Sequence, residues 1–332
     1  MSHQPVRIRV LRGAEIRALL PMAECIDLMG ATMAALSAGH ARVPLRTVMR
    51  LPGDHGMMGV MPGALTDPAC FGVKLLSLFP GNVAAGYSSH LGLVMLFEAE
   101  HGLPVAMMDA AEITAIRTAA ASGLATRLLA RNDAGDLAIL GAGEQARTHL
   151  EAMSLVRPLR RVRVWARRPD QAETFARFES ERLGLAIETA NSVAEAVAGA
   201  DIVCTLTGAK DPILFSEMIA PGAHLNVVGS SVPSAAEIDT AALVRSRLFV
   251  DRRESTVNEG GDYLRALKAG AITESHILGE IGEVVSGAVA GRLTPEDITL
   301  YKSLGVAAQD LASAHHVLGK ATQQGIGQVI EI

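Results

Sequence analysis

The chain has few aromatic residues, no excess of positive charge and no long apolar run, and each shortage excludes a class of protein. Aromatic residues make up 3% of the 332 residues, and 30 Lys and Arg face 35 Asp and Glu, a formal net charge of −5. Nucleic-acid binders usually have a basic surface and often stack bases on aromatic rings, so we expect no nucleic acid as partner. No apolar run reaches the roughly 20 residues of a membrane helix, and MSHQPVRIRV lacks the apolar core of a signal peptide. We therefore expect no membrane partner and a cytoplasmic location.

Cysteine and histidine form no pattern that indicates a disulfide framework or a metal site. Cys25, Cys70 and Cys204 lie far apart and form no CxxC, so we expect three buried, reduced thiols. The ten histidines include no HExxH motif, and the neighbours His315 and His316 diverge on a helix. We expect no metal. What the chain does have is 49% hydrophobic residues and 32 glycines, enough for large cores in about two domains.

The order of expected elements changes along the chain. Residues 14–39 have helical spacing that Pro21 should interrupt, and residues 46–109 alternate short β-rich runs with Gly and Pro turns, as in an antiparallel sheet. A helix is expected over 111–131. From residue 136, six short apolar strands alternate with helices, which is typical of a doubly wound parallel sheet.

A last helix, expected over 300–318, follows the alternating segment and could return to the first domain. The predicted fold class is α/β. A doubly wound domain over 119–304 is inserted into an α+β domain that is built from both chain ends, residues 1–118 and 305–332.

A glycine cluster joins the first strand of the alternating segment to a helix. The strand DLAIL is followed by the GxGxxA run Gly141, Ala142, Gly143, Glu144, Gln145 and Ala146. In this pattern Gly141 permits a tight turn, Gly143 lets a pyrophosphate approach the backbone, and Ala146 lets the helix pack on the strand. The helix N-terminus offers N–H groups to phosphate. The sequence therefore predicts a dinucleotide-binding Rossmann domain, and a purely structural turn is the alternative.

The end of the second strand, VRVWARRPD, bears on which dinucleotide is bound. NAD enzymes usually have Asp or Glu here for the ribose 2′-hydroxyl, whereas this chain has Ala166, Arg167 and Arg168. Because arginine pairs well with phosphate, NADP(H) is favoured and NAD(H) is the alternative. Asp170 lies close enough to weaken the distinction, and both arginines also suit a solvated turn.

Three basic residues stand out in the first domain. Lys74 lies in FGVKLLSLF, where a lysine is either buried with a partner or directed into a cleft. A buried lysine with a lowered pKa can take part in proton transfer, and a structural ion pair is the alternative. Arg117 opens the run RTAAASG and suits a bidentate carboxylate, although a solvated helix position would also explain it. Arg46, in VPLRTVM, is a weaker candidate of the same kind.

Taken together, these segments resemble the ornithine cyclodeaminase/μ-crystallin family. The resemblance rests on GVKLLSLFPGN, ITAIRTAAAS, LAILGAGEQA and KSLGVAAQDLA, and it covers about residues 10–325. It implies a homodimer in which a split substrate-binding/dimerisation domain carries an inserted Rossmann NAD(P)-binding domain. It also implies a small α-imino or α-amino acid as substrate.

The resemblance further implies roles for individual residues. Arg46, Lys74 and Arg117 would be the catalytic residues. The implied substrate-binding residues are Arg46, Lys74, Ser89, Arg117 and Ser231. The implied cofactor-binding residues are Ser89, Arg117, Thr118, Gly141, Gly143, Glu144, Gln145, Ala146, Arg167, Arg168, Thr205, Val228 and Gly229. Ser89 stands in the place of the threonine in the family's GLPT and retains its hydroxyl.

One departure from the family pattern favours one activity. Ornithine cyclodeaminases have an Asp in VGADxPGKTEL for the distal amine, and here VGSSVPSAAEI has Ser231 in its place. Serine offers neither a negative charge nor a carboxylate base. The sequence therefore predicts an NAD(P)H-dependent reductase of small α-imino acids such as pyrroline- or piperideine-2-carboxylate, of the ketimine reductase or amino-acid dehydrogenase type, with hydride transfer to C=N.

Two other functions are kept as alternatives. One is ornithine cyclodeaminase, which forms proline and ammonia from L-ornithine. The other is a non-catalytic NADPH-binding protein like μ-crystallin. Asp310 and His90 are weaker candidates for proton handling, and for Asp310 we favour a helix-packing or capping carboxylate.

Overall fold

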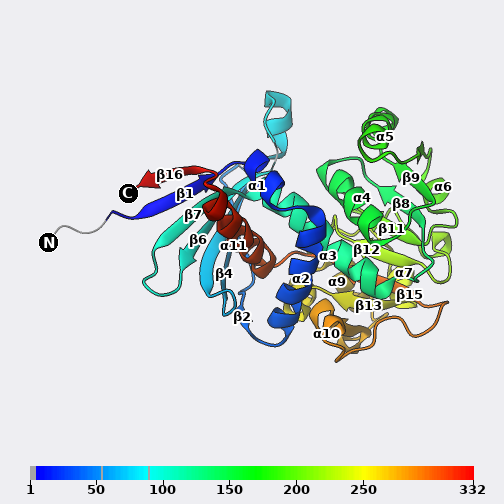
Figure 1. Cartoon of the computed structure of the whole chain (residues 1–332). Coiled ribbons are helices and arrows are strands. Elements are labelled where there is room, and N and C mark those ends of the chain that lie inside the picture. The colour runs from blue at the N-terminus through cyan, green and yellow to red at the C-terminus, as the bar shows by residue number, and fades with distance from the viewer. Residues whose placement is uncertain (1–4, 54, 89) are drawn as a thin grey trace. The chain divides into compact units, whose positions relative to one another are not determined.

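The chain folds into two units, which the computed structural model describes over residues 5–53, 55–88 and 90–332 (Figure 1). Unit 1 comprises Met1–Arg117 together with Val306–Ile332, and unit 2 comprises Thr118–Gly305. Both contain a sheet with helices packed on it, and both therefore have their own apolar core.

Unit 1 is built on a mixed sheet in the order β16-β1-β7-β6-β5-β4-β2, with β3 paired to β4. Its strands are β1 Arg7–Leu11, β2 Ala41–Arg42, β3 Thr47–Arg50, β4 Met57–Leu65, β5 Cys70–Leu78, β6 His90–Glu98, β7 Pro104–Asp109 and β16 Gln328–Glu331. The run from β3 to β7 is antiparallel, which confirms the sheet predicted over 46–109. β1 and β16, which the sequence reading missed, pair antiparallel at one edge of the sheet.

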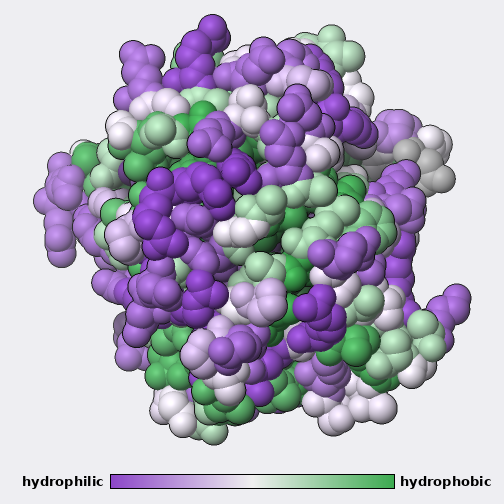
Figure 2. Space-filling view, turned by 90° about the vertical axis from the view of Figure 1, so that its right-hand side faces the viewer, coloured by the Kyte–Doolittle hydropathy of each residue, from purple (hydrophilic) through white to green (hydrophobic). Residues whose placement is uncertain are grey.

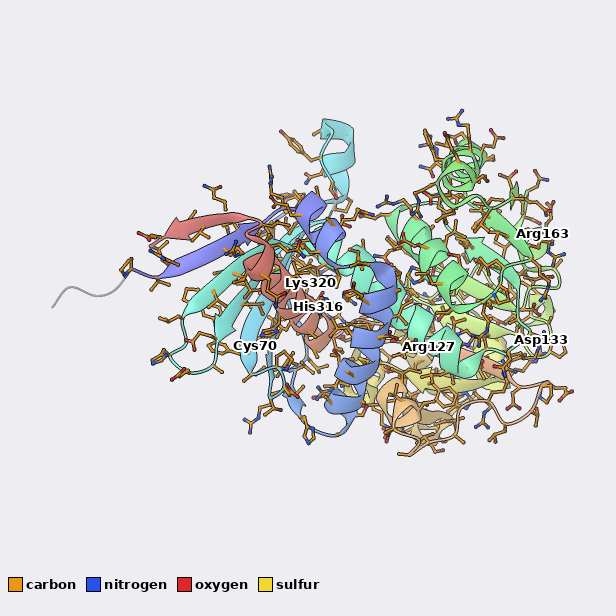
Figure 3. The ribbon with its side chains drawn as sticks, viewed as in Figure 1. Cys70, Arg127, Asp133, Arg163, His316 and Lys320 are labelled. Atoms are coloured by element: carbon orange, nitrogen blue, oxygen red, sulfur yellow. The ribbon has the colours of Figure 1, made fainter. Side chains whose placement is uncertain are left out.

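The helices of unit 1 pack on one face of this sheet. They are α1 Gly13–Leu19, α2 Met22–Ser37 and α11 Ala307–Gln324. The 3₁₀ turn η1 Pro80–Ala85 instead projects away from the sheet after β5 (Figure 1). Pro21 separates α1 from α2, as predicted, because its ring cannot continue a helix. α11 packs on β4, β5 and β6 and against α2. His316 and Lys320 lie on α11 (Figure 3). Both contact Glu24 of α2, at 3.2 Å and 2.8 Å.

Unit 2 is a parallel sheet in the order β10-β9-β8-β11-β12-β15-β13-β14. Its strands are β8 Asp136–Leu140, β9 Arg161–Trp165, β10 Ile187–Thr189, β11 Ile202–Thr205, β12 His224–Val227, β13 Ser246–Val250, β14 Ile277–Glu280 and β15 Ile298–Lys302. The central strands β11 and β12 are buried along their whole length, as expected for a parallel sheet covered on both faces. The strand order reverses between β8 and β11, and ligands of such sheets bind at the carboxyl ends of the strands beside that point. This arrangement confirms the predicted α/β class.

The helices between these strands complete unit 2, and α3 enters it from unit 1. They are α3 Ala110–Leu129, α4 Glu144–Val156, α5 Pro169–Leu183, α6 Val193–Val197, α7 Thr240–Arg245, α8 Arg253–Glu259, α9 Gly261–Lys268 and α10 Ile281–Val285, with 3₁₀ turns η2 Ser216–Met218 and η3 Glu274–His276.

The last predicted helix, over 300–318, is wrong at its start. Residues 298–302 form β15, which lies between β12 and β13, and α11 begins only at Ala307. All five residues of β15 are buried, so pairing on both sides outweighs the helical spacing that continues into α11. β14 was also missed.

No single helix in the described ranges is long and apolar enough to cross a membrane; α1 and α2 would pass that test only as a pair, and they are bent by 80° at their break. Cys25, Cys70 and Cys204 are buried and free, which confirms the prediction for the thiols. On the face seen in Figure 2, hydrophobic residues gather in short stretches between hydrophilic ones.

Candidate active site

Lys74 lies at the centre of unit 1 with its side chain only 1% exposed. It is on β5, and its partners across the sheet, Met61 on β4 and Val94 on β6, are buried apolar residues. A lysine is almost never buried so fully without a partner. The partner is Asp310, whose Oδ1 accepts a hydrogen bond of 2.8 Å from Lys74 Nζ. Of the two alternatives left by the sequence, burial with a partner is the one observed.

Asp310 also binds Arg117, so one carboxylate oxygen receives two cations. Arg117 Nε donates to the same Oδ1 at 3.0 Å, and its Nη1 donates to Gln309 Oε1 at 2.8 Å. Arg117 is 4% exposed, so the solvated helix position considered for it is wrong. Asp310 is fully buried in the first turn of α11, where the helix dipole favours a negative charge. Its Oδ2 accepts no hydrogen bond from the residues that the structure describes.

The environment of Lys74 changes its proton affinity. Burial is the largest effect and lowers the pKa of Lys74 to about 8. The carboxylate of Asp310 opposes this change, whereas the positive charges of Arg117 and Arg46 reinforce it. Burial would raise the pKa of Asp310, but the two cations outweigh it and hold that pKa below its ordinary value.

Arg46 and Ser89 complete the set of residues that the sequence assigned to substrate in the first domain. Arg46 lies half-buried between β2 and β3, close enough for its charge to act on Lys74. Ser89 lies outside the described residues, and so does the side chain of His90. The structure thus brings together Lys74 and Arg117 of the expected substrate residues, with Arg46 near them.

In unit 2 the glycine cluster forms the turn between β8 and α4. Gly141 has φ +123°, and a Cβ there would lie 2.6 Å from the carbonyl oxygen of Leu206, after β11. This position therefore requires glycine. At Gly143, by contrast, a Cβ would meet nothing within 4 Å, and no side chain caps α4 there. Ala146 is fully buried, as close packing of helix and strand requires.

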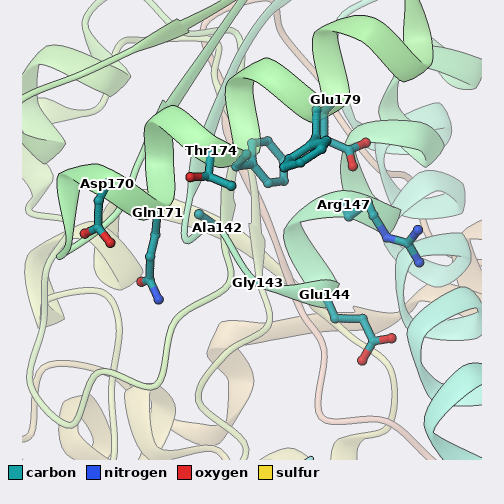
Figure 4. Close-up of a pocket in the computed structure, with 10 residues that line it drawn as sticks. Ala142, Gly143, Glu144, Arg147, Asp170, Gln171, Thr174 and Glu179 are labelled. Atoms are coloured by element: carbon teal, nitrogen blue, oxygen red, sulfur yellow. The ribbon is translucent and has the colours of Figure 1, made fainter. Parts of the chain in front are cut away.

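Unpartnered groups and an open groove lie next to this turn. Gln145 Oε1 and Thr118 Oγ1 are buried without a hydrogen-bond partner among the described residues. A groove of about 370 Å³ begins at Gly143 and runs between α4 and α5 (Figure 4). Glu144 and Arg147 line it from α4. The free backbone N–H groups and the open space at Gly143 fit a bound pyrophosphate.

The two arginines after β9 differ in their surroundings. Arg167 and Arg168 are both exposed, but Arg168 is held by Asp170 through bonds of 2.6 Å and 3.2 Å. Ala166, where NAD enzymes usually have an acidic residue, is buried. Of the two predicted phosphate ligands, Arg168 is thus bonded to a carboxylate. Arg167 has no hydrogen bond to an acidic side chain among the described residues.

The other predicted cofactor residues lie at the carboxyl ends of β11 and β12 and are held by a glutamate that the sequence reading missed. Glu237 accepts hydrogen bonds from Thr205 Oγ1 and from the backbone N–H of Gly229, both 2.7 Å, and from Thr207. Glu237 is fully buried, and burial raises its pKa. Val228 follows β12 directly and donates its N–H to the Thr205 carbonyl.

A buried ion pair continues this network. Asp262 Oδ1 accepts the N–H groups of Glu237 and Ile238, and its Oδ2 lies 2.7 Å from Lys302 Nζ, an ion pair outside hydrogen-bond geometry. Lys302 in turn donates to the carbonyl of Ser230, next to Ser231. The sequence contained a signal for the burial of Lys302, because this lysine follows the mostly apolar run ITLY just as Lys74 follows FGV. Ser231 is half-buried and lies in unit 2.

One exposed cluster offers possible metal ligands. In the turn between β6 and β7, ligand atoms of Glu98, Glu100 and His101 lie within 4.8 Å of one another. The Glu98 carboxylate accepts backbone N–H groups of Glu100, His101 and Leu103. This carboxylate therefore stabilises the turn, which accounts for the cluster without an ion.

Comparison with known proteins gives a consistent result. The model of the ornithine cyclodeaminase/mu-crystallin family matches residues 8–325. A Delta(1)-pyrroline-2-carboxylate reductase of Bacillus cereus is 34% identical over 97% of this chain and 99% of its own, and the ketimine reductase mu-crystallin of the mouse is 38% identical over 83% and 84%. The Thermococcus litoralis Delta(1)-pyrroline-2-carboxylate reductase, solved with NADH and L-proline, superposes with a TM-score of 0.94 at 37% identity, over 97% and 99% of the two chains. The chain belongs to the ornithine cyclodeaminase/mu-crystallin family.

Proposed function

We propose that this chain is an NAD(P)H-dependent oxidoreductase that reduces the C=N bond of small α-imino acids. The observation that carries the proposal is the buried group in unit 1, where Lys74 and Arg117 share the single carboxylate of Asp310. This group has one positive charge more than negative charge, so a substrate carboxylate would compensate it. Relatives named pyrroline-2-carboxylate reductase and ketimine reductase match most of the chain.

The cofactor residues fit a nicotinamide dinucleotide. Gly143 leaves space at the helix N-terminus for pyrophosphate, and Gln145 Oε1 and Thr118 Oγ1, which have no partner among the described residues, offer polar atoms to the rest of the molecule. We assign unit 2 to cofactor binding, including Gly141, Glu144, Ala146, Thr205, Val228 and Gly229. When bound, the reduced nicotinamide supplies a hydride to the imine carbon.

The residues of unit 1 hold the substrate and handle its proton. Arg46 and Arg117 bind the carboxylate, which fixes the imine carbon for attack. As hydride adds to carbon, the electron pair of the C=N π bond moves to nitrogen, which takes one proton. Lys74 Nζ carries a proton at neutral pH, with a pKa of about 8, and either donates it to this nitrogen or bonds the carboxylate. Ser89 and Ser231 stay predicted substrate contacts.

NADP(H) is the favoured cofactor, on a narrower basis than the sequence suggested. Arg167 remains the candidate ligand of the 2′-phosphate, because Arg168 is engaged by Asp170. Position 166 holds alanine, so the acidic residue that would bind the ribose 2′-hydroxyl of NAD is absent at this position. NAD(H) is the alternative, and the solved relative with NADH is an example of that cofactor in this family.

Unit 1 is also the predicted dimerisation domain. The sheet face opposite α11 carries Phe71, Leu91 and Leu93, which are 38%, 46% and 41% exposed. Strand register places them on one face, and the exposed Met49 of β3, which pairs with β4, lies on the same face. An apolar sheet face of this kind is normally covered by another chain, and a second copy would form a homodimer. Sedimentation or light scattering would test this, and a monomer would contradict it. A cytoplasmic location stays a prediction.

The activity is tested by mixing the purified protein with pyrroline-2-carboxylate and piperideine-2-carboxylate and each reduced cofactor. We expect loss of reduced-cofactor absorbance with formation of the cyclic amino acid. Ammonia release from L-ornithine without net cofactor consumption would instead identify an ornithine cyclodeaminase, which Ser231 argues against. Binding of NADPH with no turnover of any imine would identify a non-catalytic binding protein. The matched control is Lys74→Met, which should bind cofactor but not turn over.

A further inference from the structure

The carboxylate of Asp310 is the only acidic group among the charges that act on Lys74 in the described part of the chain. Arg117 comes from α3 and Arg46 from the connection between β2 and β3, and both are cations. The strands on either side of Lys74 present Met61 and Val94, which are apolar. A buried ammonium next to two guanidinium groups would lose its proton readily. Asp310 alone opposes this loss.

The geometry gives Asp310 a second effect. It binds both Lys74 Nζ and Arg117 Nε through one oxygen, Oδ1, at 2.8 Å and 3.0 Å. The two cations are therefore held at a fixed separation, with Gln309 of the same helix bonding the far side of Arg117. Asp310 is fully buried, and its Oδ2 has no hydrogen-bond partner among the described residues. Its side chain therefore bonds only Lys74 and Arg117 among those residues.

We infer that Asp310 is a positioning residue for the proposed reductase reaction: through Oδ1 it keeps Lys74 charged and sets Lys74 and Arg117 side by side for a substrate carboxylate. Asp310 does not itself transfer the proton. This inference rests on the proposed function for its consequence in catalysis, but the charge state of Lys74 is measurable without any turnover.

The direction of the pH effect follows from the charges. Whether Lys74 donates a proton or binds the carboxylate, only its protonated form acts, so kcat/KM should fall as the pH rises through about 8. Removing the negative charge of Asp310 leaves Lys74 beside two cations, and its pKa falls further. The alkaline limb should then move to lower pH, by about one to three pH units for a contact at this distance.

The kinetic experiment compares the pH profiles of kcat/KM for the wild type, Asp310→Asn and Asp310→Glu. The imine substrate titrates as well, but equally with each variant, so the difference between profiles belongs to the protein. We expect the limb of Asp310→Asn to shift to lower pH and that of Asp310→Glu to stay near the wild type. A limb of Asp310→Asn at the wild-type pH would overturn the inference.

A matched control exists in unit 2. Asp262 is as deeply buried as Asp310 and lies 2.7 Å from the buried Lys302. Asp262→Asn should weaken the fold without moving the alkaline limb. If it moves the limb as Asp310→Asn does, the shift reflects general loss of a buried ion pair, and the role assigned to Asp310 is refuted.

A second readout keeps the inference testable if Asp310→Asn folds poorly or the wild type reduces no imine. The chain has five lysines, so ¹⁵N-labelled lysine side chains give few NMR signals. The signal absent from Lys74→Arg should titrate near pH 8 in the wild type and near the same pH in Asp310→Glu. A Lys74 signal that titrates well below pH 8 in Asp310→Glu, or at the wild-type pH in Asp310→Asn, contradicts the inference. An inactive wild type with the expected titration removes the proposed function but leaves the role of Asp310 at Lys74 in place.

Discussion

Two buried lysine–aspartate pairs, one in each unit, look alike in distance and burial but differ in what surrounds them. Lys74 lies 2.8 Å from Asp310 and Lys302 lies 2.7 Å from Asp262, and all four side chains are at most 1% exposed. The hydrogen bonds of Lys302 and Asp262 go to backbone groups, the carbonyl of Ser230 and the N–H groups of Glu237 and Ile238. Asp310 instead binds a second side-chain cation, and its carboxylate accepts no backbone N–H of the residues that the structure describes.

This difference separates a structural pair from one that is available to a ligand. The pair in unit 2 holds the loop after β12, through backbone groups of Ser230, Glu237 and Ile238. The group in unit 1 consists of side chains only and has an excess of positive charge. An uncompensated positive charge inside a protein costs free energy, and a bound substrate carboxylate would compensate it.

Replacing Lys74 by methionine should give the largest functional effect. We expect kcat/KM for imine reduction to fall by about 10³-fold, because a positioned proton donor contributes roughly 10² to 10⁴-fold. The affinity for NADPH should change little, since Lys74 lies in unit 1. Steady-state kinetics and fluorescence titration of the cofactor measure both quantities. A variant that retains more than a tenth of the activity would show that the charge at Lys74 is structural, like that at Lys302.

The corresponding change in unit 2, Lys302→Met, should act on stability. It leaves Asp262 buried beside Glu237 without its cation, which typically costs about 3–5 kcal/mol. In Lys74→Met, by contrast, Asp310 keeps its bond to Arg117, so its free energy of unfolding should fall less. Urea unfolding of the two variants under the same conditions tests this order. Equal losses would remove the distinction between the pairs.

A pair of glycine substitutions tests whether the turn at Gly143 in unit 2 leaves room for a pyrophosphate. Gly143→Ala should raise the Kd for the dinucleotide at least about tenfold, or roughly 1.4 kcal/mol, because its Cβ enters the space left for pyrophosphate. Its unfolding without cofactor should match the wild type, since the Cβ meets no protein atom within 4 Å. Gly141→Ala is the contrasting variant and should destabilise the fold itself. Calorimetric titration showing unchanged affinity in Gly143→Ala would place the pyrophosphate elsewhere.

The smallest effect should come from the exposed arginines after β9. Arg167→Gln should reduce the preference for NADPH over NADH several-fold, whereas Arg168→Gln should change it less, because Asp170 already engages that guanidinium. The ratio of kcat/KM values for the two cofactors is the measurement. A larger loss in Arg168→Gln than in Arg167→Gln would mean that the ion pair opens when the cofactor binds.

The sequence was sufficient for features that depend on neighbours along the chain. Pro21 separated two helices, and the GxGxxA run lies between a strand and a helix as predicted. Lys74 was recognised from its apolar flanks. Its partner was not, because Asp310 is 236 residues away and its position in a helix looked like ordinary packing. The spacing around residue 300 was helical, yet β15 forms because strands on both sides bury it.

The polar network of unit 2 was missed for a related reason. Glu237, Asp262 and Lys302 are charged residues in loops or at element ends, where charge is ordinary, and only the fold buries them together. The apolar run before Lys302 was the one local signal for them. The flanking sequence therefore indicates that a charge is buried but not which group neutralises it.

The place of α11 in the chain has a consequence for biosynthesis. Asp310 reaches Lys74 and Arg117 from a helix that is translated after the whole of unit 2, since Thr118–Gly305 separate it from the rest of unit 1. The whole of unit 2 can thus leave the ribosome while Lys74 still lacks its counter-ion. The group of Lys74, Arg117 and Asp310 can form only after α11 has been translated, so it is assembled last.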